Sequence, residues 1–214
     1  MTDIAVIGAG MAGLVCAQQL TQAGYSVMVI DKSRGVGGRV ATRRLHDTKA
    51  DHGACYIKPR DELSLRLVNL LNQKGDVEVW TNILHAQENS SSLVAHSPLP
   101  LPYTAPAGMN VIAKFLAQGL EIHRGERVSK IRLNSQNQWH LTSETNQEFT
   151  ASSVIVAIPA PQAVMLLESL PENFLDNLDN KFLEKLRSVE YYPAITVMAG
   201  YPESSSQPEW KAIA

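Results

Sequence analysis

The chain has 214 residues, a formal net charge of −2 and a hydrophobic content of 44%. With 13 glycines and 11 prolines it is neither collagenous nor low in complexity, and its near-zero charge argues against nucleic acid or an acidic membrane as a partner recognised by bulk charge. Two cysteines, Cys16 and Cys55, are too few for a disulfide scaffold or a zinc site.

The first thirty residues predict a β-α-β unit. Ile4–Ile7 is a short apolar run that is typical of a strand buried on both faces. A helical pattern follows, with Gly24 placed to end it, and Val27–Ile30 predicts a second buried strand. Such a unit requires the two strands to be parallel.

The rest of the chain predicts a mixture of helices and strands around a proline-rich loop over 97–108. The predicted helices cover 61–74, 109–118 and 171–186, and the predicted strands cover 77–80, 127–133, 138–142, a short segment near Phe149, 153–158 and 191–198. In the helix over 61–74 we expect Leu63, Leu67, Leu70 and Leu71 to form the apolar face.

The most informative motif lies between the first predicted strand and helix. Gly8-Ala9-Gly10-Met11-Ala12-Gly13 fits G-x-G-x-x-G, in which the glycines allow a tight turn, approach to a pyrophosphate and close helix packing. Asp31 ends the second strand 21 residues after Gly10, where a carboxylate accepts a hydrogen bond from a ribose hydroxyl. Together these residues predict a dinucleotide site.

Gly37-Gly38-Arg39 follows Asp31 closely, and an arginine at this point can pair with phosphate oxygens. The run of residues 31–44 resembles the flavoprotein amine oxidase superfamily and, within it, the renalase-type branch. The stretch Asp51-His52-Gly53-Ala54-Cys55-Tyr56 is similar to the D-x-G-A-x-Y/F loop that lies beside the flavin in this family. Two positions depart from the pattern, with Cys55 in place of a common glutamine and Ile57 in place of a common aromatic residue.

The resemblance implies FAD as cofactor and places Val128 and Ala157 near its adenosine end. The residues that we expect to bind the cofactor are Gly8, Ala9, Gly10, Met11, Ala12, Gly13, Asp31, Lys32, Gly37, Gly38, Arg39, His52, Gly53, Ala54, Val128 and Ala157. No catalytic side chain is predicted, because the flavin carries the chemistry. The six histidines have no metal-ligand spacing, so no metal is expected.

The predicted fold class is α/β. We expect a Rossmann-like FAD-binding domain in residues 1–75 and 106–160, with a parallel sheet and an antiparallel β crossover. An interleaved and incomplete α+β substrate lobe would take 76–105 and 161–214. The resemblance implies a further glycine-rich C-terminal segment, so that this sequence corresponds to about two-thirds of the implied length.

Three functions are compatible with these features. The first is an FAD-dependent oxidoreductase that takes a hydride from a dihydronicotinamide-like or amine substrate, with oxygen as the expected acceptor. The second is a catalytically inactive nucleotide-binding or interaction protein. The third is an NAD(P) dehydrogenase, which Gly37-Gly38-Arg39 disfavours. The first predicts a small-molecule substrate as the partner.

No basic leader and no bilayer-spanning stretch is visible, so we expect a cytoplasmic protein.

Overall fold

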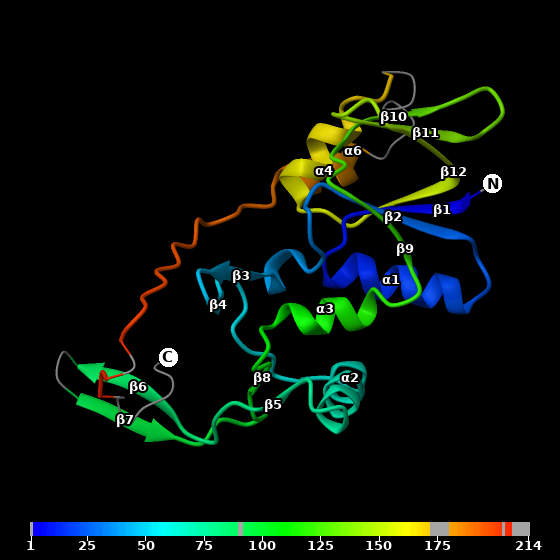
Figure 1. Ribbon diagram of the computed structural model, residues 1–214. Helices are drawn as coiled ribbons and strands as arrows, with labels where there is room; N and C mark the ends of the chain where they lie inside the picture. Colours follow the sequence, from blue (N-terminus) through cyan, green and yellow to red (C-terminus); the bar gives the residue numbers. More distant parts are fainter. Residues whose placement is uncertain (1, 90–91, 172–179, 203, 207–214) are drawn as a thin grey trace. The chain divides into compact units, whose positions relative to one another are not determined.

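The computed structural model describes residues 2–89, 92–171, 180–202 and 204–206 (Figure 1). The chain divides into two compact units, Met1–Arg39 with Ala113–Ala194 and Val40–Ile112 with Ile195–Ala214. These units are defined only by how compactly the chain packs. The FAD-binding domain and the substrate lobe that the sequence predicts therefore remain a prediction. Among the described residues, no helix combines the length and the apolar character that a membrane span requires.

The first unit contains the predicted β-α-β unit. Strand β1 (Thr2–Ile7), helix α1 (Met11–Gln22) and strand β2 (Val27–Asp31) follow one another, and the two strands pair in parallel. Strand β9 (Glu121–Arg124), which the sequence analysis missed, adds to β2, also in parallel. The carboxyl ends of three parallel strands therefore lie at one edge of the sheet, the usual place for a ligand in an open α/β sheet.

An antiparallel β-meander completes the six-stranded sheet, whose order is β10-β11-β12-β1-β2-β9. Its strands are β10 (Val128–Leu133), β11 (Trp139–Ser143) and β12 (Glu148–Val156). The sequence analysis predicted separate strands near Phe149 and over 153–158, and this was wrong. β12 is one continuous strand because its first half pairs with β11 and its second half with β1.

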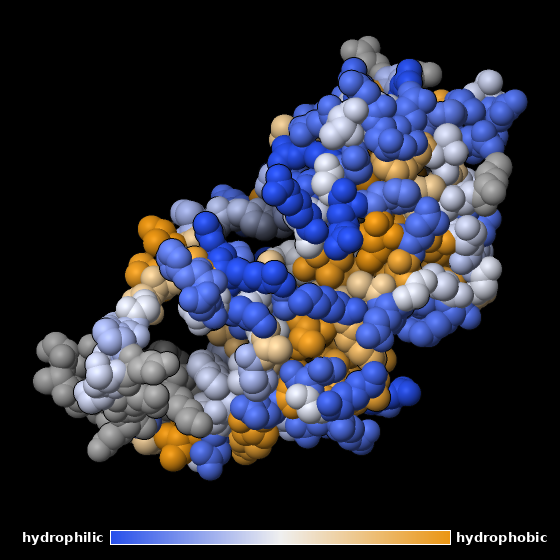
Figure 2. All heavy atoms as spheres, in the orientation of Figure 1, coloured by the Kyte–Doolittle hydropathy of each residue, from blue (hydrophilic) through white to orange (hydrophobic). Residues whose placement is uncertain are grey.

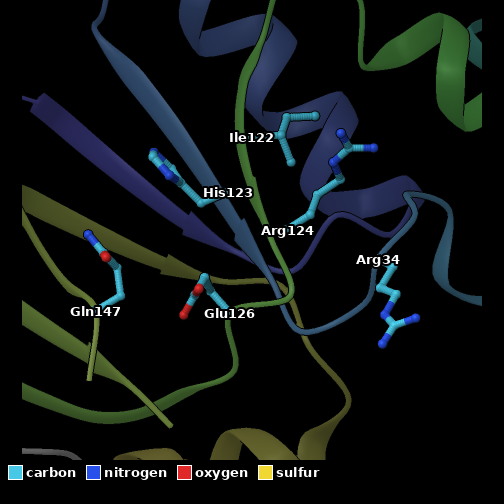
Figure 3. A pocket seen from close by; sticks show the side chains of 6 residues that line it. All are labelled: Arg34, Ile122, His123, Arg124, Glu126 and Gln147. Carbon is cyan, nitrogen blue, oxygen red and sulfur yellow. The ribbon is translucent and has the colours of Figure 1, made fainter. Parts of the chain in front are cut away.

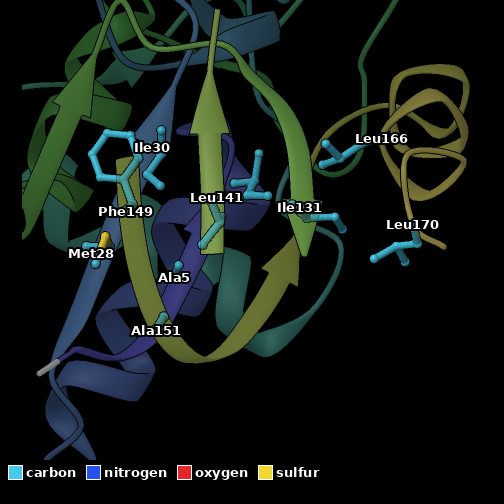
Figure 4. Close-up of a cluster of buried hydrophobic side chains, with 10 residues drawn as sticks. Ala5, Met28, Ile30, Ile131, Leu141, Phe149, Ala151, Leu166 and Leu170 are labelled. Atoms are coloured by element: carbon cyan, nitrogen blue, oxygen red, sulfur yellow. The ribbon is translucent and has the colours of Figure 1, made fainter. Parts of the chain in front are cut away.

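The main core of this unit consists of side chains from the strands of the sheet, joined by Leu166 from a helix that was not predicted, α4 (Ala160–Leu167), and by Leu170 after it (Figure 4). Ala5 and Ile30 come from the central strands, whereas Leu141 and Leu166 come from the meander and from α4. The sequence analysis predicts a strand over 153–158 and no helix after it, where Pro159-Ala160-Pro161 follows. Proline is tolerated in the first turn of a helix, where its missing N–H has no partner to lose, and α4 begins there.

The second unit contains helix α2 (Glu62–Gln73), as predicted, with Asp61 as its N-cap. The buried positions of α2 are Val68 and Leu71, whereas Leu63 and Leu70 are exposed, so the predicted apolar face was only partly right. Helix α3 (Asn110–Leu116) lies within the predicted range 109–118 and crosses the boundary between the two units.

The described residues of the second unit also form three two-stranded sheets. They are β3 (Thr42–Leu45) with β4 (Thr48–Asp51), β5 (Glu78–Val79) with β8 (Tyr103–Thr104), and β6 (Leu84–Asn89) with β7 (Ser92–His96). Of these strands only β5 was predicted, and it is shorter than the expected range 77–80.

The C-terminal part agrees less well with the sequence analysis. Helix α6 (Asn180–Arg187) overlaps the end of the helix predicted over 171–186, while residues 172–179 of that prediction lie outside the described residues. The strand predicted over 191–198 is absent, although its composition favours one. A strand needs a neighbour for its backbone hydrogen bonds, and no described strand pairs with this segment.

Candidate functional site at the carboxyl edge of the parallel strands

The glycine-rich turn after β1 packs closely against Ala157, the residue that follows β12. Gly8 has a φ of +111°, and a Cβ added there would lie 2.7 Å from the carbonyl oxygen of Ala157. A Cβ on Gly13 would lie 1.9 Å from the carbonyl oxygen of Gly8. These two glycines are therefore required by the fold of the chain itself.

Gly10 differs from its two neighbours in the motif. It is the N-cap of α1 with a φ of −76°, which any residue adopts, and a Cβ added there would meet nothing within 4 Å. Packing within the chain thus gives no reason for glycine at this position. The open space beside Gly10 fits the approach of a ligand backbone such as a pyrophosphate.

The N-terminus of α1 offers donors to the same space. The first helical hydrogen bond runs from the N–H of Leu14 to the carbonyl of Gly10, so the N–H groups of Met11, Ala12 and Gly13 have no acceptor within the helix. No side chain caps this end, and its first turn contains no acidic residue. A helix terminus of this kind attracts phosphate through its N–H groups and its dipole.

Asp31 holds the turn in place. Its Oδ2 accepts a hydrogen bond from the N–H of Ala9 at 2.6 Å, and its Oδ1 accepts one from the N–H of Ser33 at 2.7 Å. A carboxylate has about four lone-pair sites, so acceptor capacity remains for a ribose hydroxyl. The neighbouring Lys32 donates from Nζ to Gln162 Oε1 at 3.3 Å.

The second glycine pair lies directly against the first turn. The N–H of Gly37 donates to the carbonyl of Ala9 at 2.9 Å, and a Cβ on Gly38 would lie 3.3 Å from the Cα of Gly10. Arg39 follows in a short 3-10 helix (Gly38–Val40), is exposed, and forms no ion pair within the described part of the chain. The structure therefore brings Gly8–Gly13, Asp31 and Gly37–Arg39 together at one edge of the sheet.

The two other predicted residues of the first unit, Val128 and Ala157, lie at the ends of strands. Ala157 follows β12, and its N–H donates to the carbonyl of Ile7 at 2.8 Å. Val128 begins β10, two residues after Glu126, whose N–H donates to the carbonyl of Asp31 at 2.9 Å. Both residues are half-buried.

The remaining predicted residues, His52, Gly53 and Ala54, belong to the second unit and are exposed. The carbonyl of His52 accepts a hydrogen bond from Thr196 Oγ1 at 2.9 Å. Their part in the cofactor site remains a prediction.

Within the same loop, burial raises the pKa of the Cys55 thiol above its ordinary value, and the negative charge of Asp51 raises it further. A raised pKa lowers the share of thiolate, the form of cysteine that acts as a nucleophile.

Asp51 stabilises this loop through hydrogen bonds that were not predicted from the sequence. Its carboxylate accepts hydrogen bonds from the Thr42 hydroxyl at 2.5 Å and from the N–H of Met109 at 3.0 and 3.2 Å. Thr42 Oγ1 in turn accepts from the N–H of Asn110 at 3.1 Å. The loop that carries His52 is thus tied through Asp51 to the start of α3.

An open cavity of about 580 Å³ lies around the end of β9 in the first unit (Figure 3). Its lining comes from β9 and from the segments after β2 and β11, and consists of Arg34, Ile122, His123, Arg124, Glu126 and Gln147. Hydrogen bonds from Ser143 and Thr145, together with the nearby His123, lower the pKa of the Glu126 carboxyl. None of the residues predicted to bind the cofactor lines this cavity. No cluster of residues able to hold a metal ion occurs in the described ranges.

Comparisons with known proteins agree with this geometry. Residues 6–71 match the family model of the NAD(P)-binding Rossmann-like domain, and residues 76–211 match that of the flavin-containing amine oxidoreductases. The second match alone covers more than half of the chain. The chain belongs to the flavin-containing amine oxidoreductase family. The family and the dinucleotide-binding fold make FAD its cofactor, as expected, and the empty space beside Gly10 fits that group.

Individual relatives show how far this similarity extends. Renalase of Mus musculus is 25% identical over 202 residues, which cover 89% of this chain and 56% of renalase. The putative flavin-containing monoamine oxidase AofH of Mycobacterium tuberculosis is 41% identical over 69 residues, which cover 32% of this chain and 15% of that protein. A solved putrescine oxidase redesigned in its cofactor binding has a TM-score of 0.67 at 14% identity, with coverage of 87% of this chain and 63% of that one, and it supports the α/β fold. The chain spans little more than half the length of renalase.

Proposed function

We propose that this family member is an FAD-dependent oxidoreductase that oxidises a dihydronicotinamide-like substrate in preference to simple amines and passes the electrons to oxygen. The observation that carries the proposal is the extent of the match to renalase, which covers 89% of the chain. The matches to monoamine oxidases cover only about a third of it. The renalase-like run over residues 31–44 supports the same choice.

When bound, FAD supplies the hydride-accepting chemistry. The chain's own residues bind and orient it. The N–H groups at the start of α1 would bind the pyrophosphate, and the Asp31 carboxylate would accept a hydrogen bond from the ribose. Arg39, which has no ion-pair partner among the described residues, would add a positive charge.

The sharpest test of the cofactor site is Gly10→Val. A branched side chain would occupy the open space beside Gly10, so we expect FAD binding to be lost while the chain still folds, because the new Cβ meets nothing within 4 Å. Gly35→Val is the matched control, since a Cβ at Gly35 also meets nothing within 4 Å. FAD affinity is measured from the flavin absorbance of the purified variants, and folding from their thermal unfolding. Unchanged FAD binding in Gly10→Val would overturn the assigned site.

The substrate is tested separately with FAD-loaded protein. Peroxide release is measured with isomers of reduced nicotinamide nucleotides and with simple amines at equal concentrations. We expect faster turnover with the dihydronicotinamides. Faster turnover of the amines would contradict the proposed substrate class and leave the cofactor site intact.

A further inference from the structure

The β3–β4 hairpin presents two cations opposite each other. Strands β3 and β4 form an antiparallel hairpin (Figure 1). In its register Arg44 pairs with Lys49, and Thr42 pairs with Asp51. Cross-strand pairs of this kind lie with their Cβ atoms about 4.5–5.5 Å apart, and like charges directly opposite each other destabilise the pairing. The hairpin thus places two like charges directly opposite each other.

The Arg44–Lys49 pair lies on the same face of the hairpin as the Thr42–Asp51 pair. Side chains alternate between the two faces of a strand, and Thr42 precedes Arg44 by two residues. The hydrogen bond from Thr42 Oγ1 to Asp51 Oδ1 shows that this pair faces one side together. Arg43, which pairs with Ala50, lies on the opposite face.

Neither carboxylate of the hairpin, Asp47 in its turn or Asp51 in β4, forms an ion pair with these two cations in the described part of the chain. Asp51, the acidic residue on their face, is already engaged by the Thr42 hydroxyl and by the N–H of Met109. Neither Arg44 nor Lys49 forms an ion pair with any described residue, and both are exposed. The guanidinium and the ammonium group are therefore free to bind the same external anion.

We infer that this face of the hairpin binds the phosphate group of a small phosphorylated molecule between Arg44 and Lys49. A guanidinium matches two phosphate oxygens at once, and an ammonium group adds a compact charge and three donors. A dianion placed between them also removes their mutual repulsion. The site uses none of the residues assigned to FAD and does not depend on the proposed reaction.

The inference is tested on FAD-saturated protein, in which the glycine-rich turn is filled. Inorganic phosphate and ribose 5-phosphate are titrated at constant ionic strength against chloride, and binding is followed by the NMR shifts of residues 42–51. We expect saturable shifts with both phosphates. Arg44→Gln and Lys49→Gln should each weaken binding by about tenfold, the usual worth of one charge-assisted hydrogen bond. Arg43→Gln removes the same charge from the opposite face and should leave binding unchanged.

A second readout does not depend on ligand binding. In phosphate-free buffer, Arg44→Gln should raise the melting temperature because it removes the repulsion, whereas Arg43→Gln should not. Shifts that are equal for phosphate and chloride, or equal losses in the Arg43 and Arg44 variants, would overturn the inference. Binding to vesicles containing phosphatidic acid without binding of ribose 5-phosphate would also overturn it, in favour of a membrane.

Discussion

Asp31 shows how one side chain can serve both the fold and the cofactor. In the structure its two carboxylate oxygens accept from the N–H groups of Ala9 and Ser33, which fixes the turn between β1 and α1. The same carboxylate is the expected acceptor for a ribose hydroxyl of FAD. Removing it should therefore weaken the cofactor site directly and also loosen the turn that shapes it.

We expect Asp31→Ala to weaken FAD binding by about 1.5–3 kcal/mol, the worth of a hydrogen bond to a charged group. The control is Asp3→Ala, because Asp3 Oδ2 also accepts from a backbone N–H, that of Ser26 at 2.8 Å, yet lies at the opposite end of the parallel strands. FAD titrations of both variants measure the difference. Equal FAD affinity in the two variants would remove Asp31 from the site.

Gly108 is a second residue whose identity follows from its surroundings. It has a φ of +98°, and an added Cβ would lie 2.5 Å from Cγ2 and 2.6 Å from Oγ1 of Thr42. Thr42 cannot move away easily, because its hydroxyl donates to Asp51 and accepts from Asn110. A side chain at position 108 would thus disturb the start of α3.

We expect Gly108→Ala to lower the free energy of unfolding by about 2–5 kcal/mol, combining backbone strain with overpacking. Gly119→Ala provides the comparison, since Gly119 has a φ of +77° but open space around its Cα, and should cost only the strain, about 1–2 kcal/mol. Urea unfolding of both variants gives the two values. Equal losses would show that Thr42 yields to the new methyl group.

At the scale of single elements, α2 owes its start to a capping box. Asp61 Oδ1 accepts from the N–H of Ser64 at 2.8 Å, and Ser64 Oγ accepts from the N–H of Asp61 at 3.2 Å. Only Val68 and Leu71 of this helix are buried, so the cap carries a larger share of its stability than in a well-packed helix.

Asp61→Ala should destabilise α2 by about 0.5–2 kcal/mol, because it leaves first-turn N–H groups without an acceptor. Asp61→Asn retains a cap oxygen and should cost less. Helix content by circular dichroism and hydrogen exchange of residues 62–66 report the change. If Ala and Asn behave alike at position 61, the cap does not stabilise α2.

At the scale of the whole molecule, the described surface contains apolar side chains that a folded monomer normally covers. Figure 2 shows hydrophobic atoms, in orange, at the described surface. In the segment after α6, Tyr192, Ile195 and Val197 are 85%, 93% and 84% exposed. Residues 154–158 are half-buried, in contrast to the buried β1 beside them. Exposed apolar side chains that gather into a large patch mark an interaction site or a tendency to associate.

We therefore expect residues 1–214 expressed alone to self-associate, and the double substitution of Ile195→Thr and Val197→Thr to raise the monomer fraction. The melting temperature should stay the same, because both side chains are almost fully exposed. Val6→Thr, at a position with 0% exposure, should instead lower it. Light scattering after size exclusion measures the monomer fraction. An unchanged oligomer distribution would show that this segment does not drive association.

The sequence by itself determined the β1–α1–β2 unit, because local signals carry it: an apolar run, a glycine turn, a helical period and a strand that ends at Asp31. The same local signals pointed to the family and to FAD. Other features depend on contacts between residues that are far apart in the sequence, and these appear only in the tertiary structure. β12 is one strand because it pairs with β11 and β1 at once, and residues 191–198 form none because no described strand pairs with them. The tie from Asp51 to Met109, 58 residues apart, and the empty space that distinguishes Gly10 from Gly8 and Gly13 likewise exist only once the chain has folded.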